Sequence, residues 1–158
     1  MTPTVYTMGY EGRKPADLLM IAERLDATIV DIRYRAWSAH PQWRHGALRE
    51  FLGDRYARCV QLGNKRYREP ANADGSRQIE LVDAAAGAQY VLEHPHSVIL
   101  MCGCRNAETC HRSNVARLLI DQYDQRVFEI MWARGANASG ILWAAYDWAE
   151  VDSWAGKD

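Results

Sequence analysis

Short runs of β-branched and apolar residues alternate along this chain with longer stretches whose apolar residues recur every three or four positions. The runs predict strands at 4–8, 28–32, 56–62, 97–101 and 127–132, and the stretches predict helices at 15–25, 47–52, 78–92 and 111–122. Such an alternation favours a parallel sheet, because each helix returns the chain to the same end of the sheet. We therefore predict an α/β fold, a three-layer sandwich with a mostly parallel sheet of about five strands.

The chain is predicted to be one domain over residues 1–158, because it has no internal repeat and no linker rich in proline or glycine. Its content of 48% hydrophobic and 25% charged residues is typical of a globular protein with a core. From about residue 139 the sequence is rich in tryptophan, and helical spacing predicts a C-terminal helix over 141–151. Exposure of Trp143 and Trp148 on that helix would favour a homodimer.

The placement of apolar residues and cysteines bears on where the protein works. No apolar run reaches the roughly 18 to 20 residues that cross a membrane, and the polar start does not resemble a signal sequence. We therefore expect a cytoplasmic protein without membrane contact. Cys102, Cys104 and Cys110 lie close together in the sequence, which favours a metal site or thiol chemistry over structural disulfides in such a chain. Cys59 is predicted to be a small buried side chain.

Unusual residues gather where the predicted strands end. In doubly wound sheets, ligands bind beyond the carboxyl ends of the strands. The segments that follow the predicted strands are 9–13, 33–43, 62–68, 102–112 and 132–139. Because they also hold arginines, tryptophans and cysteines, we expect them to form one functional cleft.

The loop from Cys102 to Arg112 allows three interpretations. Cys102 could be a nucleophile, since a thiolate near a helix start and an arginine is reactive, although the spacing is not the Cys-x5-Arg of protein phosphatases. The set Cys102, Cys104, Cys110 and His111 could instead bind zinc or iron, although the spacing is unusual for zinc. The third interpretation has buried, inert cysteines and an anion held by Arg112 and backbone amides.

A basic stretch precedes this loop in the sequence. Between residues 28 and 68 nine Lys and Arg residues stand against three Asp and Glu, although the whole chain has a net charge of −1. Arg33 alternates here with Trp37 and Trp43, a mixture that suits bases stacked on aromatic rings with phosphates nearby. The alternative is a solvated charged surface over tryptophans that pack on the core.

Two further segments carry candidate residues. Asp31 interrupts a buried strand and must be paired, with Arg33 or Arg112 as its partner, unless it serves as a general base. The run Tyr10-Glu11-Gly12-Arg13 follows a strand as phosphate loops do, but it lacks the glycines of the nucleotide-binding motifs. A plain turn that uses Gly12 is the alternative.

Three motifs together resemble the DUF488 family: Met8-Gly-Tyr-Glu-Gly-Arg13, Val30-Asp-Ile-Arg33 and Cys102-x7-Cys110-His111-Arg112. The resemblance covers about residues 4–132. It implies a single α/β domain of a family described as of unknown function, one branch of which is connected by its label with N3-modified adenine. Relatives usually have Cys-Ala-Glu where this chain has Cys-Gly-Cys, so a carboxylate needed there would have to come from Asp31 or Glu11.

These observations lead to one predicted function and one rival. We predict a protein that binds, and could process, a nucleobase, a nucleotide or nucleic acid containing modified adenine. The predicted catalytic residues are Cys102, Asp31 and His111, and the predicted ligand-binding residues are Tyr10, Glu11, Arg13, Arg33, Trp37, Trp43, Cys104, Cys110 and Arg112. This prediction requires no cofactor. The rival is a metal-binding or thiol-redox module that uses Cys102, Cys104, Cys110 and His111, with zinc or iron as the metal.

Overall fold

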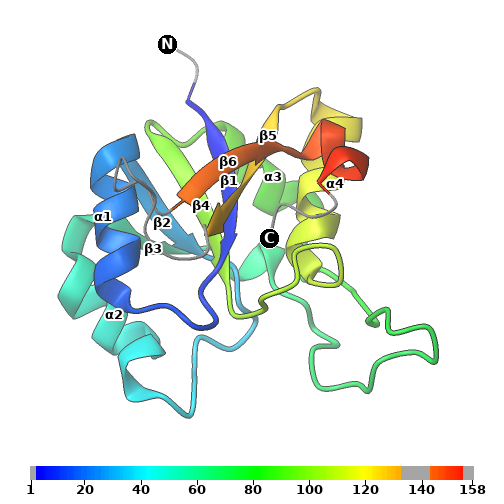
Figure 1. Cartoon of the computed structure of the whole chain (residues 1–158), viewed down its shortest axis with the longest axis horizontal. Helices are drawn as coiled ribbons and strands as arrows, with labels where there is room; N and C mark the ends of the chain where they lie inside the picture. The colour runs from blue at the N-terminus through cyan, green and yellow to red at the C-terminus, as the bar shows by residue number, and fades with distance from the viewer. Residues whose placement is uncertain (1–2, 133–142, 155–158) are drawn as a thin grey trace.

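A six-stranded sheet forms the centre of the protein in a computed structural model of the chain, which describes residues 3–132 and 143–154 (Figure 1). The strands are β1 (Val5–Gly9), β2 (Ala27–Asp31), β3 (Tyr56–Arg58), β4 (Ser97–Cys102), β5 (Val127–Trp132) and β6 (Trp143–Asp147). Their order across the sheet is β3-β2-β4-β1-β5-β6. Neighbouring strands are parallel throughout except for β5 and β6, which are antiparallel.

Helices cover both faces of this sheet. They are α1 (Pro15–Leu25), α2 (His45–Leu52), α3 (Ala84–Leu92) and α4 (His111–Tyr123). The first two pack on one face and the last two on the other, so that two separate apolar cores flank the strands (Figure 1). The predicted three-layer α/β sandwich with a mostly parallel sheet is thereby confirmed.

The central strands are apolar because they are covered on both sides. All five residues of β2 are buried, and so are five of the six residues of β4. The helix that follows β1 begins at Pro15, where a missing N–H costs nothing, and Asp17 accepts a hydrogen bond from the Lys14 N–H at 2.9 Å. It ends at Leu25, and the C-cap residue Asp26, with a φ of 47°, turns the chain directly into β2.

Two predicted elements are shorter than expected. The predicted strand 56–62 ends at Arg58 and continues as a 3₁₀ turn over Val60–Leu62. The predicted helix 78–92 begins only at Ala84, because the Asp83 side chain caps it by accepting a hydrogen bond from the Ala86 N–H. Residues 78–82 are instead drawn into extended pairing with the segment that starts at Asn64.

The prediction of a C-terminal helix over 141–151 is wrong for the part that the structure describes. Residues 139–142 lie outside the described ranges, but 143–147 form β6 and 148–153 form a 3₁₀ helix. β5 would otherwise present an open edge, and its pairing with β6 outweighs the helical spacing of the sequence. Trp148 is buried and Trp143 is partly buried, so the exposure that would have favoured a homodimer is not observed.

The helices themselves give one further result. Within the two described ranges, none combines the length and the apolar character that crossing a membrane requires.

Candidate functional site

The candidate site lies where two neighbouring strands send their chains to opposite faces of the sheet. β1 and β4 are parallel neighbours, and their last residues, Gly9 and Cys102, face each other across the ladder. The chain leaves β1 toward α1 on one face and leaves β4 toward α4 on the other (Figure 1). Such a point leaves a crevice at the carboxyl ends of the strands. The loop 103–110, between β4 and α4, borders this crevice.

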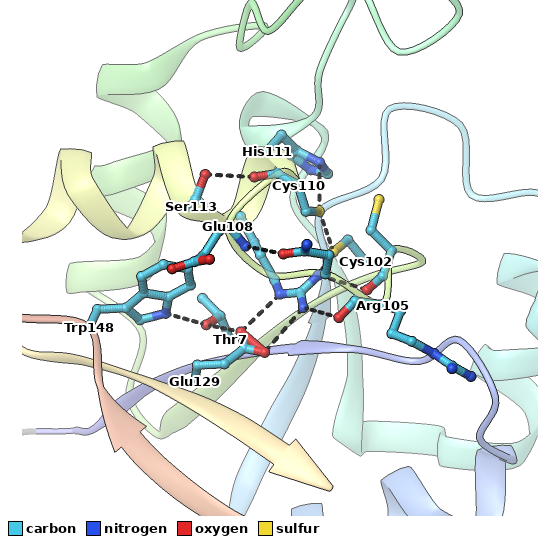
Figure 2. A network of polar contacts seen from close by, with 12 residues as sticks. Thr7, Cys102, Arg105, Glu108, Cys110, His111, Ser113, Glu129 and Trp148 are labelled. Atoms are coloured by element: carbon cyan, nitrogen blue, oxygen red, sulfur yellow. Dashed lines mark hydrogen bonds and ion pairs between the residues drawn. The ribbon is translucent and has the colours of Figure 1, made fainter. Parts of the chain in front are cut away.

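Arg112, in the first turn of α4, holds this loop in place, and its partners Cys102, Arg105 and Glu129 are labelled in Figure 2. Its Nε and Nη2 donate to the Glu129 carboxylate at 2.8 and 3.2 Å. Its Nη1 donates to Cys102 Sγ at 3.1 Å and to the Cys104 carbonyl at 2.8 Å, and Nη2 also donates to the Arg105 carbonyl at 3.2 Å. All five N–H groups are thus engaged inside the protein, and the side chain is buried. Arg112 orders the loop and has no N–H to spare for an external anion.

The three thiols of the loop differ in their ionisation. Sγ of Cys102 and Sγ of Cys110 are 2.9 Å apart, and both side chains are buried, whereas Cys104 is exposed. Burial raises the pKa of Cys102, and contact with the other two thiols raises the pKa of Cys104. Hydrogen bonds from those two thiols hold the pKa of Cys110 well below its ordinary value, and the guanidinium of Arg112 adds to the effect. These shifts favour Cys110 as the thiolate, where the sequence suggested Cys102.

Cys110 is also the N-cap residue of α4, a position at which unpaired backbone N–H groups favour negative charge. The ring of the next residue, His111, lies beside it, with Nδ1 3.7 Å from Cys110 Sγ. Nε2 of the ring lies 3.0 Å from the carbonyl oxygen of Ile32. Because a carbonyl only accepts, Nε2 carries a hydrogen and donates it, which leaves Nδ1 directed at the thiol.

The same arrangement fits part of the predicted metal-ligand set. The ligand atoms of Cys102, Cys110 and His111 all lie within 4.8 Å of one another. Cys104, the fourth predicted ligand, is not part of this group, although its thiol contacts those of the other two cysteines. The imidazole is held by a backbone carbonyl through its other nitrogen, as metal-bound histidines usually are.

A pocket of about 260 Å³ opens beside these thiols. It is lined by Arg33, Tyr34, Arg35, Trp37, Asn64, Tyr67, Arg77, Cys102, Gly103, Cys104, Thr109, Cys110 and His111. Three arginines are among these residues, and none of the described residues that line the pocket is acidic. The lining of the pocket therefore combines arginines, which attract anions, with the thiols of Cys102, Cys104 and Cys110.

The arginines of the pocket are held in different ways. Arg33 is buried and bonds to Asp31 through Nε and Nη2 at 2.9 and 2.7 Å, and it donates to the Tyr10 hydroxyl through Nη1 at 3.2 Å. Two of its five N–H groups remain for the pocket. The side chains of Arg35 and Arg77 are exposed and have no hydrogen bond or ion pair with other parts of the described chain.

Aromatic rings stand at the mouth of the pocket. Trp37 is 59% exposed and lies under the guanidinium of Arg44, 4.8 Å from it. Tyr34 and Tyr67 are also exposed, and their ring centroids are 5.8 Å apart. Three accessible rings therefore surround a cationic cavity, which is the composition expected of a site for a flat anionic molecule.

Several predicted residues lie elsewhere. Tyr10 and Trp43 stack on each other, with centroids 4.1 Å apart and planes 15° apart, so these two rings are not free to sandwich a base. Asp31 is fully buried and also accepts a hydrogen bond from the Tyr56 hydroxyl at 2.6 Å, which makes it an anchor for Arg33.

Glu11 and Arg13 line a second cavity of about 680 Å³, to which Arg112 also contributes. Glu11 accepts a hydrogen bond from the Arg105 N–H, and Arg13 lies 4.4 Å over the ring of Trp132. The predicted site residues are thus divided. The thiols, His111, Arg33 and Trp37 meet in the first pocket, and the β1–α1 loop faces the second cavity.

Sequence reasoning missed some residues that the structure brings to the site. Tyr34, Asn64, Tyr67 and Thr109 follow predicted strands and could have been included by the same rule that selected their neighbours. Glu129 is an acid inside an apolar strand, the signal that singled out Asp31. Nothing near Arg77 in the sequence indicates its place in the pocket.

Comparison with known proteins gives no further identification. No protein-family model, no curated protein and no solved structure matches the chain. The resemblance to the DUF488 family stays a prediction, and the site must be interpreted from its own geometry.

Proposed function

We propose that this protein binds a nucleotide, or another planar anionic molecule carrying a nucleobase, in the pocket beside the thiols. One observation carries the proposal: three arginines and three accessible aromatic rings line the pocket, and no acidic residue is among its described lining residues. A free anion without a ring could not stack on Trp37 or Tyr67. A neutral base could not form an ion pair with Arg35 or Arg77.

The arginines and the aromatic rings of the pocket make separate contributions to the free energy of binding. Arg35 and Arg77 are unpaired toward the rest of the described chain, so they can bind phosphate without breaking an existing ion pair. Each such charged hydrogen bond contributes about 1.5–3 kcal/mol. Stacking of a base on an aromatic ring contributes about 1–3 kcal/mol.

The size of the pocket favours one nucleotide. Its 260 Å³ is near the lower end of the roughly 300–1,000 Å³ of small-molecule sites. A mononucleotide, or one nucleotide of a single strand, fits this space better than a duplex does. The thiols also line this pocket, so the ligand would lie against Cys110.

Cys110 is the residue that we assign as the nucleophile toward this ligand. Its sulfur lines the pocket, it caps α4, and its neighbour His111 is placed to exchange a proton with it. A thiol used in this way must be kept reduced, which fits a protein of the cytoplasm.

Isothermal titration calorimetry with adenosine monophosphate, adenosine and inorganic phosphate tests the proposal. We expect the nucleotide to bind more tightly than either part. The double change Arg35→Gln and Arg77→Gln should weaken nucleotide binding by about tenfold or more, as the loss of charged hydrogen bonds implies. Arg117→Gln, on an exposed part of α4, is the matched control and should leave binding unchanged. Equal affinity for phosphate and nucleotide would remove the base from the proposal.

A metal centre is the second candidate, favoured by the three ligand atoms of Cys102, Cys110 and His111 within 4.8 Å. Zinc takes thiolate and imidazole ligands of this kind. Elemental analysis of protein purified without added metal separates the candidates. About one zinc or iron per chain, lost in Cys110→Ala but kept in Cys59→Ala, would establish the metal centre. Absence of metal from the folded protein would leave the nucleotide pocket as the better account.

A further inference from the structure

Two of the three thiols in the loop, those of Cys102 and Cys110, are both buried and in contact. Sγ of Cys102 and Sγ of Cys110 lie 2.9 Å apart, and both side chains line the pocket. A disulfide has an S–S distance of about 2.05 Å, so the two sulfurs would have to approach by less than about 1 Å to form one. Cys59, the remaining buried thiol, does not line the pocket.

The backbone around this pair is held on both sides. Cys102 is the last residue of a central strand, and Cys110 caps a helix (Figure 2). Arg112 bonds to Cys102 Sγ and to two carbonyls of the intervening loop. The contact between the sulfurs is therefore built into the fold at this point and does not depend on an exposed loop.

We propose that Cys102 and Cys110 are a reversible oxidation site that reacts with hydroperoxides and closes as a disulfide on the floor of the pocket. The reactant is a hydroperoxide because such a molecule is small enough to reach thiols that only a pocket exposes. Formation of the bond is independent of the proposed function. Its consequence, loss of the nucleophile, rests on that function.

The reaction balances in two steps. The Cys110 thiolate attacks one oxygen of the peroxide, the O–O bond breaks, and hydroxide or alkoxide leaves, which gives a sulfenic acid on Cys110. The sulfur of Cys102 then attacks the Cys110 sulfur, the S–O bond breaks, and the hydroxide that leaves takes the proton of Cys102 as water. The two sulfurs lose two electrons and the peroxide gains them. A dithiol reductant restores both thiols by exchange.

Peptide mapping tests this pairing directly. Arg105 lies between the two cysteines, so trypsin yields the peptides 78–105 and 106–112. After treatment of the metal-stripped, full-length protein with hydrogen peroxide, these peptides should be joined under non-reducing conditions. The intact mass should fall by about two units, for the two hydrogens lost in a disulfide, and a dithiol should reverse the change.

Three variants decide which thiols take part. Cys104→Ser should still give the joined peptides, because Cys104 shares a peptide with Cys102 but not the proposed bond. The double variant Cys102→Ser/Cys104→Ser, which leaves no neighbouring thiol, should stop at a sulfenic acid on Cys110 that dimedone traps. Cys59→Ser should behave as the wild type. Joined peptides that disappear in Cys104→Ser, or a wild type in which no peptides join, would overturn the assignment.

The same samples separate this inference from the proposed function. If the reduced protein binds adenosine monophosphate and the oxidised protein forms the joined peptides, the two proposals stand together. If the peptides join but the reduced protein binds no nucleotide, the proposed function fails and the oxidation site stands. If the nucleotide binds but peroxide joins no peptides, only the oxidation site fails.

Discussion

Arg112 is a charged side chain that the fold has removed from water. It is only 1% exposed and forms an ion pair with Glu129, which is itself buried. The carboxylate also accepts a hydrogen bond from the Thr7 hydroxyl at 2.7 Å, and Trp148 donates to Thr7 at 2.7 Å. Four side chains from distant parts of the sequence are therefore linked by one series of hydrogen bonds beneath the site. The position of the loop 103–110 thus depends on the packing of β5 and of the C-terminal segment.

Removal of Arg112 should be costly because it leaves a buried carboxylate without its partner. We expect Arg112→Gln to lower the free energy of unfolding by about 3–5 kcal/mol near pH 8. The loss should shrink toward pH 5, where the orphaned Glu129 can take up a proton. Lys65→Gln, which breaks an exposed pair with Glu80, should cost no more than about 1 kcal/mol. Urea unfolding of the three proteins measures the differences. Equal losses in both variants would show that Arg112 is not a structural centre.

Glu129 should also give the wild type a distinctive pH dependence. Burial raises the pKa of Glu129 to about 6, although Arg112 and Thr7 oppose the shift. In the unfolded chain the pKa returns to about 4.3, so between these values the folded state binds more protons. The contribution of this group to the free energy of unfolding therefore falls by about 2 kcal/mol as the pH rises through that interval, and it is constant above it.

Comparison with Glu129→Gln isolates this contribution, because glutamine does not titrate. The difference in the free energy of unfolding between wild type and variant should fall by about 2 kcal/mol between about pH 4 and pH 7. Urea unfolding at a series of pH values gives the difference directly. A difference that rises with pH would mean that the ion pair outweighs burial and that the pKa of Glu129 is lowered.

At the scale of elements, the loop between β4 and α4 and the end of β1 fit together tightly. A Cβ atom on Gly9 would lie 1.9 Å from the Cys104 carbonyl oxygen and 3.0 Å from Nη1 of Arg112. Glycine is therefore needed at the end of β1 for contact with a neighbouring backbone, and no unusual φ is involved. The thiols keep their positions because β1 leaves this space for the loop.

Gly9→Ala should therefore disturb the site and not only the strand. We expect overpacking to lower the free energy of unfolding by about 1–3 kcal/mol. Binding of the nucleotide proposed above should also weaken, since the loop that carries the thiols must shift. Gly46→Ala is the matched control, because a Cβ on Gly46 in α2 would have no atom within 4 Å. It should leave binding unchanged and could add up to about 1 kcal/mol of stability. Thermal unfolding and calorimetry check both, and an unaffected Gly9→Ala protein would contradict the packing described.

The ends of the helices show which local sequence signals were sufficient to predict where a helix begins and ends. The helix at 15–25 was predicted with its ends because proline opens it and its apolar spacing is regular. The helix at 78–92 was predicted too long because its first residues also suit an extended conformation, and Asn64 holds them in one. The Asn64 side chain donates to the Gln78 carbonyl and accepts from the Glu80 N–H. A pairing between residues 14 to 16 positions apart leaves no periodic signal in the sequence.

At the scale of the whole molecule, the sheet places one of its central strands, β4, next to the site. β4 has strands on both sides and helices on both faces, whereas β3 and β6 are the two edges of the sheet. Amide hydrogen exchange should therefore be slowest for residues 97–102 and much faster in β6 and in the connection 64–82. Mass spectrometry of exchanged peptides measures this order. Exchange in β4 as fast as in β6 would be incompatible with its central position.

This arrangement explains how the pocket can be both fixed and accessible. Cys102 ends the central strand β4 and Cys110 caps α4, and the arginines and rings that line the pocket with them come from the connections 33–37 and 64–77. Loops on a rigid scaffold commonly carry binding residues in this way. The proposed specificity for a nucleotide would thus depend on the connections, and the proposed thiol chemistry on the scaffold.

Local patterns in the amino-acid sequence were enough to predict the layers of this protein, the order of most of its strands and helices along the chain, and the loop in which the thiols lie. They were enough because hydrophobic periodicity, proline and strand-end positions are local properties of the chain. Three contacts depend on the folded arrangement of distant segments: Arg112 faces Glu129, Tyr10 stacks on Trp43, and Arg77 reaches the pocket. The same arrangement also placed residues 143–147 of the predicted C-terminal helix in strand β6. Each of these outcomes is a contact between residues far apart in the sequence. Burial and charge can favour such a contact only after the sheet has brought the two residues together.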